Sequence, residues 1–373
     1  NLCLKNNIKA LETVDDDGKY TKNIIKFEGI HIFKANPIVI ENLKNQKKLL
    51  ANGKLTHSYP HSWRSKAPLV HRATAQWFIS MESHSLRTKS LKAIDETVFY
   101  PSKAKERIKA MIETRPDWCV SRQRVWGVPL PIFLSKKSGE ALIDDEVFEN
   151  IANIFEKEGS DCWFSDDDQK FLGKKYNSKD YEKMSDIVEV WFDSGSTHSY
   201  VLEKREDLKW PASMYLEGSD QHRGWFHSSL LESCGTRGRA PFESILSHGF
   251  VVDGKGLKMS KSLGNAIAPE DILKKYGADI LRIWVASSNY AEDLRIDYSI
   301  LDQHAESYRK IRNTFRYLLG NLNDNFPKLD LEKIDLNKLP ELEQFMLHKI
   351  YSLNLNFKKY FKNYDFHNLY KEL

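Results

Sequence analysis

The spacing of hydrophobic residues in the middle of this chain predicts a strand, a helix and a second strand in succession. Residues 213–216 and 244–252 are short apolar runs with the length and composition of buried strands. Between them, the apolar residues of 222–232 recur at helical spacing. Strand, helix and strand within about 40 residues form the βαβ unit of a parallel sheet. We therefore expect an α/β fold whose sheet contains this unit.

Helical spacing also recurs before and after this unit. Asn36 and Pro37 suit the N-cap and the first position of one helix. A further strand is expected over residues 187–196, ending in a turn that places Asp193 at the ligand side of a parallel sheet. From residue 266 onward the pattern is helical. The predicted helices are residues 36–53, 85–94, 104–113, 144–159, 269–273, 278–286, a long helix whose apolar face runs from Tyr308 to Leu322, and a last one that Pro340 opens.

Polar residues follow both strands of the central unit at the point where each strand ends. Glu217, Gly218, Asp220 and Gln221 follow the first strand, and His248 lies near the end of the second. In a parallel sheet ligands bind outside the carboxyl ends of the strands, so these residues are expected to face one crevice. A helix that begins at Asp220 and Gln221 would also direct free N–H groups at the crevice, which suits an anion.

A glycine-rich turn with two nearby lysines follows the second strand. Residues 253–256, Asp-Gly-Lys-Gly, free the next segment to move. That segment contains Lys258 and Lys261 on either side of a Met-Ser pair. Two ammonium groups on a mobile loop beside a crevice can neutralise a polyphosphate as negative charge develops on it. The pattern predicts a phosphate-binding loop, which we name the lysine loop (residues 253–265).

Several segments resemble one enzyme family. Lys258-Met259-Ser260-Lys261-Ser262 resembles the KMSKS signature of class I aminoacyl-tRNA synthetases. The segments similar to the isoleucyl branch of that class are EGSDQHRGWF at residues 217–226, WCVSRQRVWG at 118–127 and WFDSG at 191–195.

This resemblance implies a fold and a division of the chain. The fold is the second half of a class I synthetase Rossmann-type parallel sheet with insertions, followed by the start of an α-helical anticodon-binding bundle. Residues 1–72 would be the C-terminal tail of an editing insertion. Residues 73–298 would be the second half of the catalytic domain with small insertions and the lysine loop. Residues 299–373 would be the helical junction and the start of the anticodon-binding domain.

The resemblance also implies an ATP-dependent ligase that activates isoleucine as isoleucyl-adenylate and transfers it to tRNA(Ile). Its partners would be L-isoleucine, tRNA(Ile) and ATP, which enters with Mg²⁺. Lys258 and Lys261 would act on the phosphates in catalysis, and His248 would join them in binding ATP. Trp225, with Trp126 as a second candidate, would bound the pocket for the amino-acid side chain. The residues expected to bind the aminoacyl-adenylate are Glu217, Gly218, Asp220, Gln221 and Trp225.

The second signature of the class, His-x-Gly-His, does not occur in the sequence. In the family it faces KMSKS across the ATP, so the chain would contain about half of a catalytic site. The chain starts at Asn1 without a methionine and stops inside a helical pattern at Leu373. We expect an internal fragment of a longer enzyme, a monomer of the cytoplasm, and we expect no activity from the fragment alone.

Composition and short motifs argue against several other classes. Lys and Arg total 56 against 52 Asp and Glu, and the net charge of +4 only weakly favours a polyanionic partner. The four cysteines lie far apart without a C-x-x-C pair, so no zinc site or disulfide framework is expected. His57 and His61 have a helical ligand spacing, but Pro60 argues against a helix there, and we assign no metal site. No apolar run reaches the ~18 residues that span a membrane, and no G-x-x-x-x-G-K-[ST] indicates a P-loop.

Two alternatives stay open. A valyl- or leucyl-type synthetase of the same class is disfavoured by the segments EGSDQHRGWF and WFDSG. A tRNA-binding module without catalytic activity is disfavoured because such a module need not keep Glu217, Lys258 and Lys261. Four basic residues of the long predicted helix fit either a solvated face or a tRNA contact: Arg309, Lys310, Arg312 and Arg316.

Overall fold

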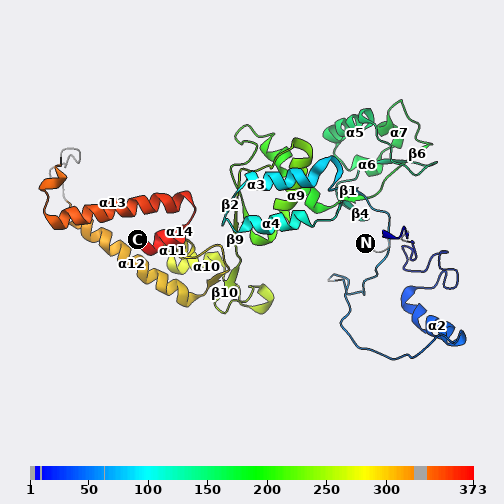
Figure 1. The fold of residues 1–373 in the computed structure, drawn as a ribbon, viewed down its shortest axis with the longest axis horizontal. Coiled ribbons are helices and arrows are strands. Elements are labelled where there is room, and N and C mark those ends of the chain that lie inside the picture. Colours follow the sequence, from blue (N-terminus) through cyan, green and yellow to red (C-terminus); the bar gives the residue numbers. More distant parts are fainter. Residues whose placement is uncertain (1–4, 9–10, 63, 323–333) are drawn as a thin grey trace. The chain divides into compact units, whose positions relative to one another are not determined.

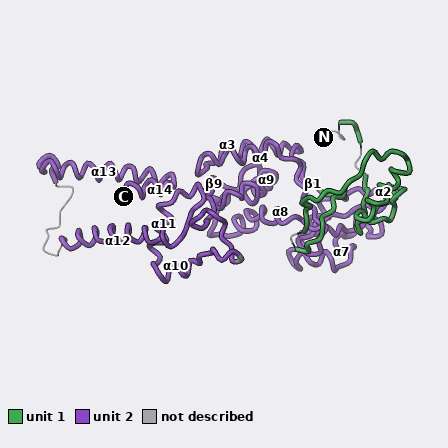
Figure 2. The backbone as a smooth tube through the Cα atoms, turned by 90° about the horizontal axis from the view of Figure 1, so that it is seen from below, with its two compact units in different colours: residues 1–77 green, residues 78–373 purple. Residues whose placement is uncertain are grey.

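The computed structural model describes residues 5–8, 11–62, 64–322 and 334–373, without the side chain of Ser262. The chain divides into two compact units, Asn1–Trp77 and Phe78–Leu373 (Figure 2). None of the helices in the described ranges combines the length and the apolar character needed to cross a membrane.

Helix α2 (Ile32–Asn45) of the first unit differs at both ends from the expected residues 36–53. It begins earlier because the His31 side chain accepts a 3.3 Å hydrogen bond from the Phe33 N–H and caps the first turn. Pro37 therefore lies inside the helix instead of at its start. The prediction relied on the Asn-Pro pair as a helix start, a local signal that the histidine cap overrides.

The larger unit contains the predicted parallel sheet (Figure 1). Three strands, β2 (Val98–Tyr100), β9 (Ser244–His248) and β8 (Tyr215–Gly218), pair in that order and all in parallel. Helix α9 (Trp225–Arg237) connects β8 to β9, so the expected strand–helix–strand unit is confirmed. Leu230 of α9 is completely buried, as expected for a helix that covers a sheet.

Two further helices complete this core. Helix α3 (Leu86–Glu96) contacts both α9 and α4 (Ala104–Glu113), and α4 contacts β2. Ile94 and Ile108, one on each helix, are completely buried. Both helices lie where the composition of residues 85–94 and 104–113 predicted them.

The expected single strand over residues 244–252 is wrong, because the chain changes sheets at Gly249. Strand β9 ends at His248, and β10 (Val251–Asp253) pairs in parallel with β11 (Leu294–Ile296) instead. The Gly249 N–H donates to the Tyr290 carbonyl at 2.8 Å. A Cβ atom on Gly249 would lie only 2.2 Å from the Glu292 carbonyl oxygen, so the crossing requires glycine.

The β10–β11 pair belongs to a helical module with its own hydrophobic core. Helices α10 (Pro269–Tyr276), α11 (Ala278–Ser287) and α12 (Tyr298–Gly320) follow the helical pattern expected after residue 266. The buried residues of the module are Ile272, Ile280, Trp284, Leu294, Ile296 and Leu301. Further along the chain, α13 (Glu341–Lys362) begins after Pro340 as predicted and packs against α14 (Phe366–Glu372).

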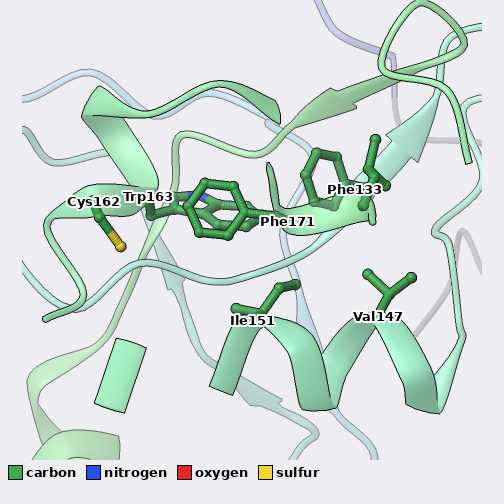
Figure 3. Close-up of a cluster of buried hydrophobic side chains, with 7 residues drawn as sticks. Phe133, Val147, Ile151, Cys162, Trp163 and Phe171 are labelled. Atoms are coloured by element: carbon green, nitrogen blue, oxygen red, sulfur yellow. The ribbon is translucent and has the colours of Figure 1, made fainter. Parts of the chain in front are cut away.

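Residues 133–183 form a small subdomain with a separate core (Figure 3). Trp163 is completely buried, and its ring meets Phe133 and Phe171 edge-on at 5.1 Å and 5.0 Å. The predicted amphipathic helix is confirmed as α5 (Asp145–Glu158), capped by Asp144. The other elements of residues 133–183 are β5 (Phe133–Ser135), α6 (Cys162–Ser165), α7 (Asp168–Leu172) and β6 (Tyr181–Lys183). Strand β5 pairs with β6 antiparallel.

The expected strand over residues 187–196 is mostly helix. Strand β7 (Ile187–Val188) pairs antiparallel with β4 (Ser121–Arg122), and α8 (Val190–Gly195) follows at once. Asp193 therefore lies on a helix and not at the end of a parallel strand. Helix α8 packs tightly on α9, since a Cβ on Gly195 would lie 3.0 Å from the Ser228 backbone. This close packing between helices explains why a short apolar run here is not a strand.

Candidate active site

The carboxyl ends of β8 and β9 bring several predicted site residues together. In the parallel register Glu217 lies opposite Ser247, and Gly218 lies opposite His248. The Glu217 side chain is exposed, and its Oε2 accepts from the Gly218 N–H at 3.2 Å. Gly218 and His248 thus lie side by side at the carboxyl ends of their strands, where ligands bind in parallel α/β folds.

The turn after β8 differs from the predicted helix start. A single 3₁₀ turn, Ser219–His222, comes first, and α9 begins only at Trp225. Gln221 Oε1 accepts from the Trp225 N–H at 2.9 Å, and Gln221 Nε2 donates to Asp220 Oδ2 at 3.1 Å. The first N–H of α9 is therefore capped by Gln221 and is not free for an anion. The expected helix start at Asp220 is wrong, because α9 begins at Trp225.

The tight turn after β8 requires glycine at position 218. A Cβ atom there would lie 2.7 Å from Asp220 Oδ1 and 3.8 Å from the Phe250 ring. The second contact joins the end of β8 to the point where the chain leaves β9 for β10. Any larger residue at position 218 would have to displace the Asp220 side chain.

Two tryptophans border the glycine that precedes α9. Trp225 stacks on Tyr215 with the ring centroids 4.0 Å apart and the planes within 5°. Burial raises the pKa of Tyr215 to about 12, so this platform stays uncharged. Trp191 of α8 lies on the other side, with a ring atom 2.8 Å from the position of a Cβ on Gly224.

Sequence reasoning did not select Trp191 as a site residue, although it opens the WFDSG segment that resembles the family. The second candidate, Trp126, is 86% exposed. The geometry favours Trp191 over Trp126 as the neighbour of Trp225.

The lysine loop has one apolar anchor between two exposed lysines. Met259 packs against the core of the helical module. Lys258 and Lys261 are exposed, and neither forms an ion pair with another described residue. Both ammonium groups are thus exposed to solvent, and their binding of a polyanion stays a prediction. The Ser262 side chain, part of the predicted signature, lies outside the described part of the chain.

The family model described as tRNA synthetases class I (I, L, M and V) matches residues 4–297. The chain belongs to this family. A relative from Pelagibacter ubique, named isoleucine–tRNA ligase, is 82% identical over 373 residues, which are 100% of this chain and 41% of the relative. A relative of the same name from Kosmotoga olearia is 46% identical over 99% of this chain and 40% of its own length. Another from Zymomonas mobilis is 50% identical over 95% of this chain and 39% of its own length. The chain therefore spans about two fifths of the length of these curated relatives.

Solved structures confirm the class I α/β fold. A methionyl-tRNA synthetase of Mycobacterium tuberculosis in complex with methionyl-adenylate matches with a TM-score of 0.55 at 14% identity. The match covers 86% of this chain and 54% of that one. A leucyl-tRNA synthetase of Agrobacterium radiobacter, in a ternary complex with tRNA, matches at 0.50 and 19% identity, over 73% of this chain and 38% of that one.

One cavity of this class I chain lies away from the predicted site. It measures about 450 Å³ and is lined in part by residues of α3, α8 and α9, including Phe192 and Leu231. Glu232 of α9 also lines it, and burial with the nearby Asp193 carboxylate raises the pKa of Glu232 to about 9. Lys258, Lys261 and Glu217 do not line this cavity, so we separate it from the candidate active site.

Metal ligands do not gather in the described part of this synthetase chain. Across residues 5–8, 11–62, 64–322 and 334–373, no three His, Cys, Asp or Glu side chains are arranged as a metal site requires. Cys119, Cys162 and Cys234 form no disulfide with one another.

Proposed function

We propose that this chain is part of an isoleucine–tRNA ligase that forms isoleucyl-adenylate and transfers the isoleucyl group to tRNA(Ile). The observation that supports this most strongly is the 82% identity over all 373 residues to a protein named isoleucine–tRNA ligase. The geometry agrees, because the turn at Glu217 and the lysine loop each follow the carboxyl end of a parallel strand.

The first proposed step needs no enzyme nucleophile. A carboxylate oxygen of isoleucine attacks the α-phosphorus of ATP, the bond to the bridging oxygen breaks, and pyrophosphate leaves with the charge. Lys261 stabilises this developing charge, and Lys258 helps to hold the phosphates. Mg²⁺ is part of the ATP substrate and neutralises the same phosphates. The chain contributes position and positive charge.

The adenylate is held at the edge formed by Gly218 and His248 in this proposal. The exposed Glu217 carboxylate can accept from two donors, either ribose hydroxyls or the substrate ammonium. Asp220 and Gln221 complete the cradle around the Gly218 backbone, and His248 lies beside the adenosine. Trp225 bounds the pocket of the isoleucine side chain.

The division of the chain implied by the family is proposed as well: an editing-insertion tail over 1–72, catalytic residues 73–298, and a helical junction over 299–373. Helix α12 exposes four basic residues that suit the tRNA backbone: Arg309, Lys310, Arg312 and Arg316. Free cysteines fit a reducing cytoplasm, where the enzyme would act as a monomer.

Amino-acid-dependent exchange of pyrophosphate into ATP tests the proposal. The protein is prepared at the full length of its relatives and assayed with isoleucine, valine and leucine. We expect exchange with isoleucine at the highest kcat/KM. Exchange with valine or leucine alone would replace the proposal by a valyl- or leucyl-type enzyme. Binding of tRNA without exchange on any amino acid would leave a non-catalytic tRNA-binding module.

A further inference from the structure

Asp253 closes the first turn of the lysine loop. One oxygen, Oδ1, accepts from the backbone N–H groups of Lys255 at 3.0 Å and Leu257 at 2.8 Å. The other oxygen, Oδ2, accepts from the Asn265 side-chain amide at 2.9 Å. These bonds, with that from Asn265 as the largest cause, lower the pKa of Asp253 below its usual value. The carboxylate is therefore charged when it joins the two ends of the loop.

Asn265 extends the same connection to the backbone around the lysines. Its Oδ1 accepts from the Ser260 N–H at 2.9 Å, and its Nδ2 also donates to the Lys258 carbonyl at 3.2 Å. One side chain thus fixes the residue that bears the first ammonium group and the residue just before Lys261. Both Asp253 and Asn265 are half-buried, which strengthens these bonds relative to fully solvated ones.

We infer that Asp253 and Asn265 form a latch that positions the lysine loop, so that Lys258 and Lys261 reach the phosphates of ATP together. This inference rests on the proposed function. Neither residue touches substrate in it, so both are positioning residues. Met259 holds the middle of the loop on the helical module, and the latch holds its two ends.

The latch matters for rate because an ordered loop has already lost its conformational freedom before the reaction. If the loop must be ordered during the reaction, that entropy adds to the barrier. The lysines interact most strongly with charge that develops in the transition state. Loss of the latch should therefore lower kcat more than it raises the KM for ATP.

Alanine variants test the latch in the full-length protein by isoleucine-dependent pyrophosphate exchange. Asp253→Ala and Asn265→Ala should each lower kcat by roughly 10–100-fold, the range expected for one or two lost hydrogen bonds to a charged group. The double variant should be no slower than the worse single variant, because the two residues act as a unit. Asp302→Asn is the matched control. Asp302 accepts from the Tyr276 hydroxyl at 2.7 Å in the same module, and its exchange should stay at the wild-type rate.

Exchanging the two side chains distinguishes loss of the hydrogen bond between positions 253 and 265 from a general loss of stability. Asn265→Asp alone sets two carboxylates against each other, and Asp253→Asn alone sets two amides against each other. Together they restore a donor at position 253 and an acceptor at position 265, with only the bond to the Lys258 carbonyl lost. The double exchange should regain most of the wild-type kcat. A double exchange as slow as the worse single variant would overturn the latch, as would alanine variants with wild-type kcat.

Trypsin cleavage of the loop gives a readout that does not need activity. In the absence of substrates, cleavage after Lys255, Lys258 and Lys261 should be faster in the single variants and slow again in the double exchange. Equal cleavage in all of them would overturn the latch. A wild-type protein without isoleucine-dependent exchange would instead overturn the proposed function, and the cleavage pattern would still decide whether the latch orders the loop.

Discussion

The indole N–H of Trp118 donates a 2.6 Å hydrogen bond to Glu189 Oε1, although the two residues are 71 positions apart. The other oxygen of this buried carboxylate accepts from Arg122 at 2.9 Å. Glu189 directly precedes α8, the helix that contains Trp191. The bonds therefore fix the WCVSRQRVWG segment to the helix that borders Gly224 in the candidate site.

Removing the Glu189 carboxylate should destabilise this junction. Glu189→Ala leaves the Trp118 N–H and Nη2 of Arg122 without their acceptor, and we expect a loss of about 2 kcal/mol in the free energy of unfolding. The KM for isoleucine should rise as well, because Trp191 would be held less firmly beside Gly224, which precedes the proposed pocket residue Trp225. Urea unfolding and pyrophosphate exchange measure the two effects.

A milder variant and a surface control sharpen this test. Glu189→Gln keeps an acceptor for Trp118 and should lose less than the alanine variant. Glu243→Ala breaks an exposed ion pair with Lys209 at 3.2 Å, and it should change the stability by less than ~0.5 kcal/mol. Equal losses in Glu189→Ala and Glu243→Ala would contradict a structural role for the buried carboxylate.

Lys261→Ala should reduce the rate of adenylate formation while leaving tRNA binding unchanged. The lysine is exposed and makes no ion pair with a described residue, so its loss should not disturb the fold. We expect kcat for pyrophosphate exchange to fall by ~10²–10³-fold, as for the loss of one charge-stabilising group. Lys255→Ala, an exposed lysine of the same loop, is the control and should keep the wild-type rate. Similar rates for the two variants would refute the role assigned to Lys261.

Local hydrophobic spacing was sufficient to predict the parts of this fold whose contacts are near in sequence. It predicted the β8–α9–β9 unit, α5 and the helices after residue 266, and helical composition predicted α3 and α4. Hydrophobic spacing failed where the local structure depends on a contact with a residue far away in the sequence. The chain leaves β9 where Gly249 lies against the backbone of Glu292, and helical residues 190–195 pack on α9 through Gly195. Neither contact is visible in a local pattern.

In the candidate site, too, some features follow from local sequence patterns and others depend on contacts between distant residues. The parallel register sets Gly218 beside His248, as expected from the polar residues at strand ends. Trp191 could not be selected from spacing, because its place beside Gly224 depends on the packing of α8 on α9. The latch of Asp253 and Asn265 joins residues 12 positions apart through side chains, and hydrophobic periodicity contains no signal for it.

Gly249 and Gly235 should respond to alanine with opposite signs. A Cβ on Gly249 would lie 2.2 Å from the Glu292 carbonyl oxygen, so the backbone must shift at a cost of about 1–3 kcal/mol. A Cβ on Gly235, inside α9, would meet only Leu86 Cδ1 at an ordinary 3.7 Å, and alanine there should stabilise the helix by up to ~1 kcal/mol. Thermal unfolding of both variants measures this, and a stable Gly249→Ala variant would contradict the close crossing between β9 and β10.

Glu232 should make the stability of the protein fall as the pH rises. Burial and the Asp193 carboxylate raise its pKa from 4.5 to about 9, while Arg237 acts weakly in the opposite direction. Between these values the folded protein keeps a proton that the unfolded chain has lost. The contribution of this group to stability is thus fully present below pH 4.5 and is lost progressively up to about pH 9.

Glu232→Gln removes this dependence, because glutamine imitates the protonated acid at every pH. Urea midpoints measured at pH 5, 7 and 9 should show the wild type losing stability relative to the variant at each step. Glu156→Gln, an exposed residue of α5, is the control and should follow the wild type. A constant difference between wild type and Glu232→Gln would mean that Glu232 is already ionised in the folded protein, so that the cavity admits enough water to solvate its carboxylate.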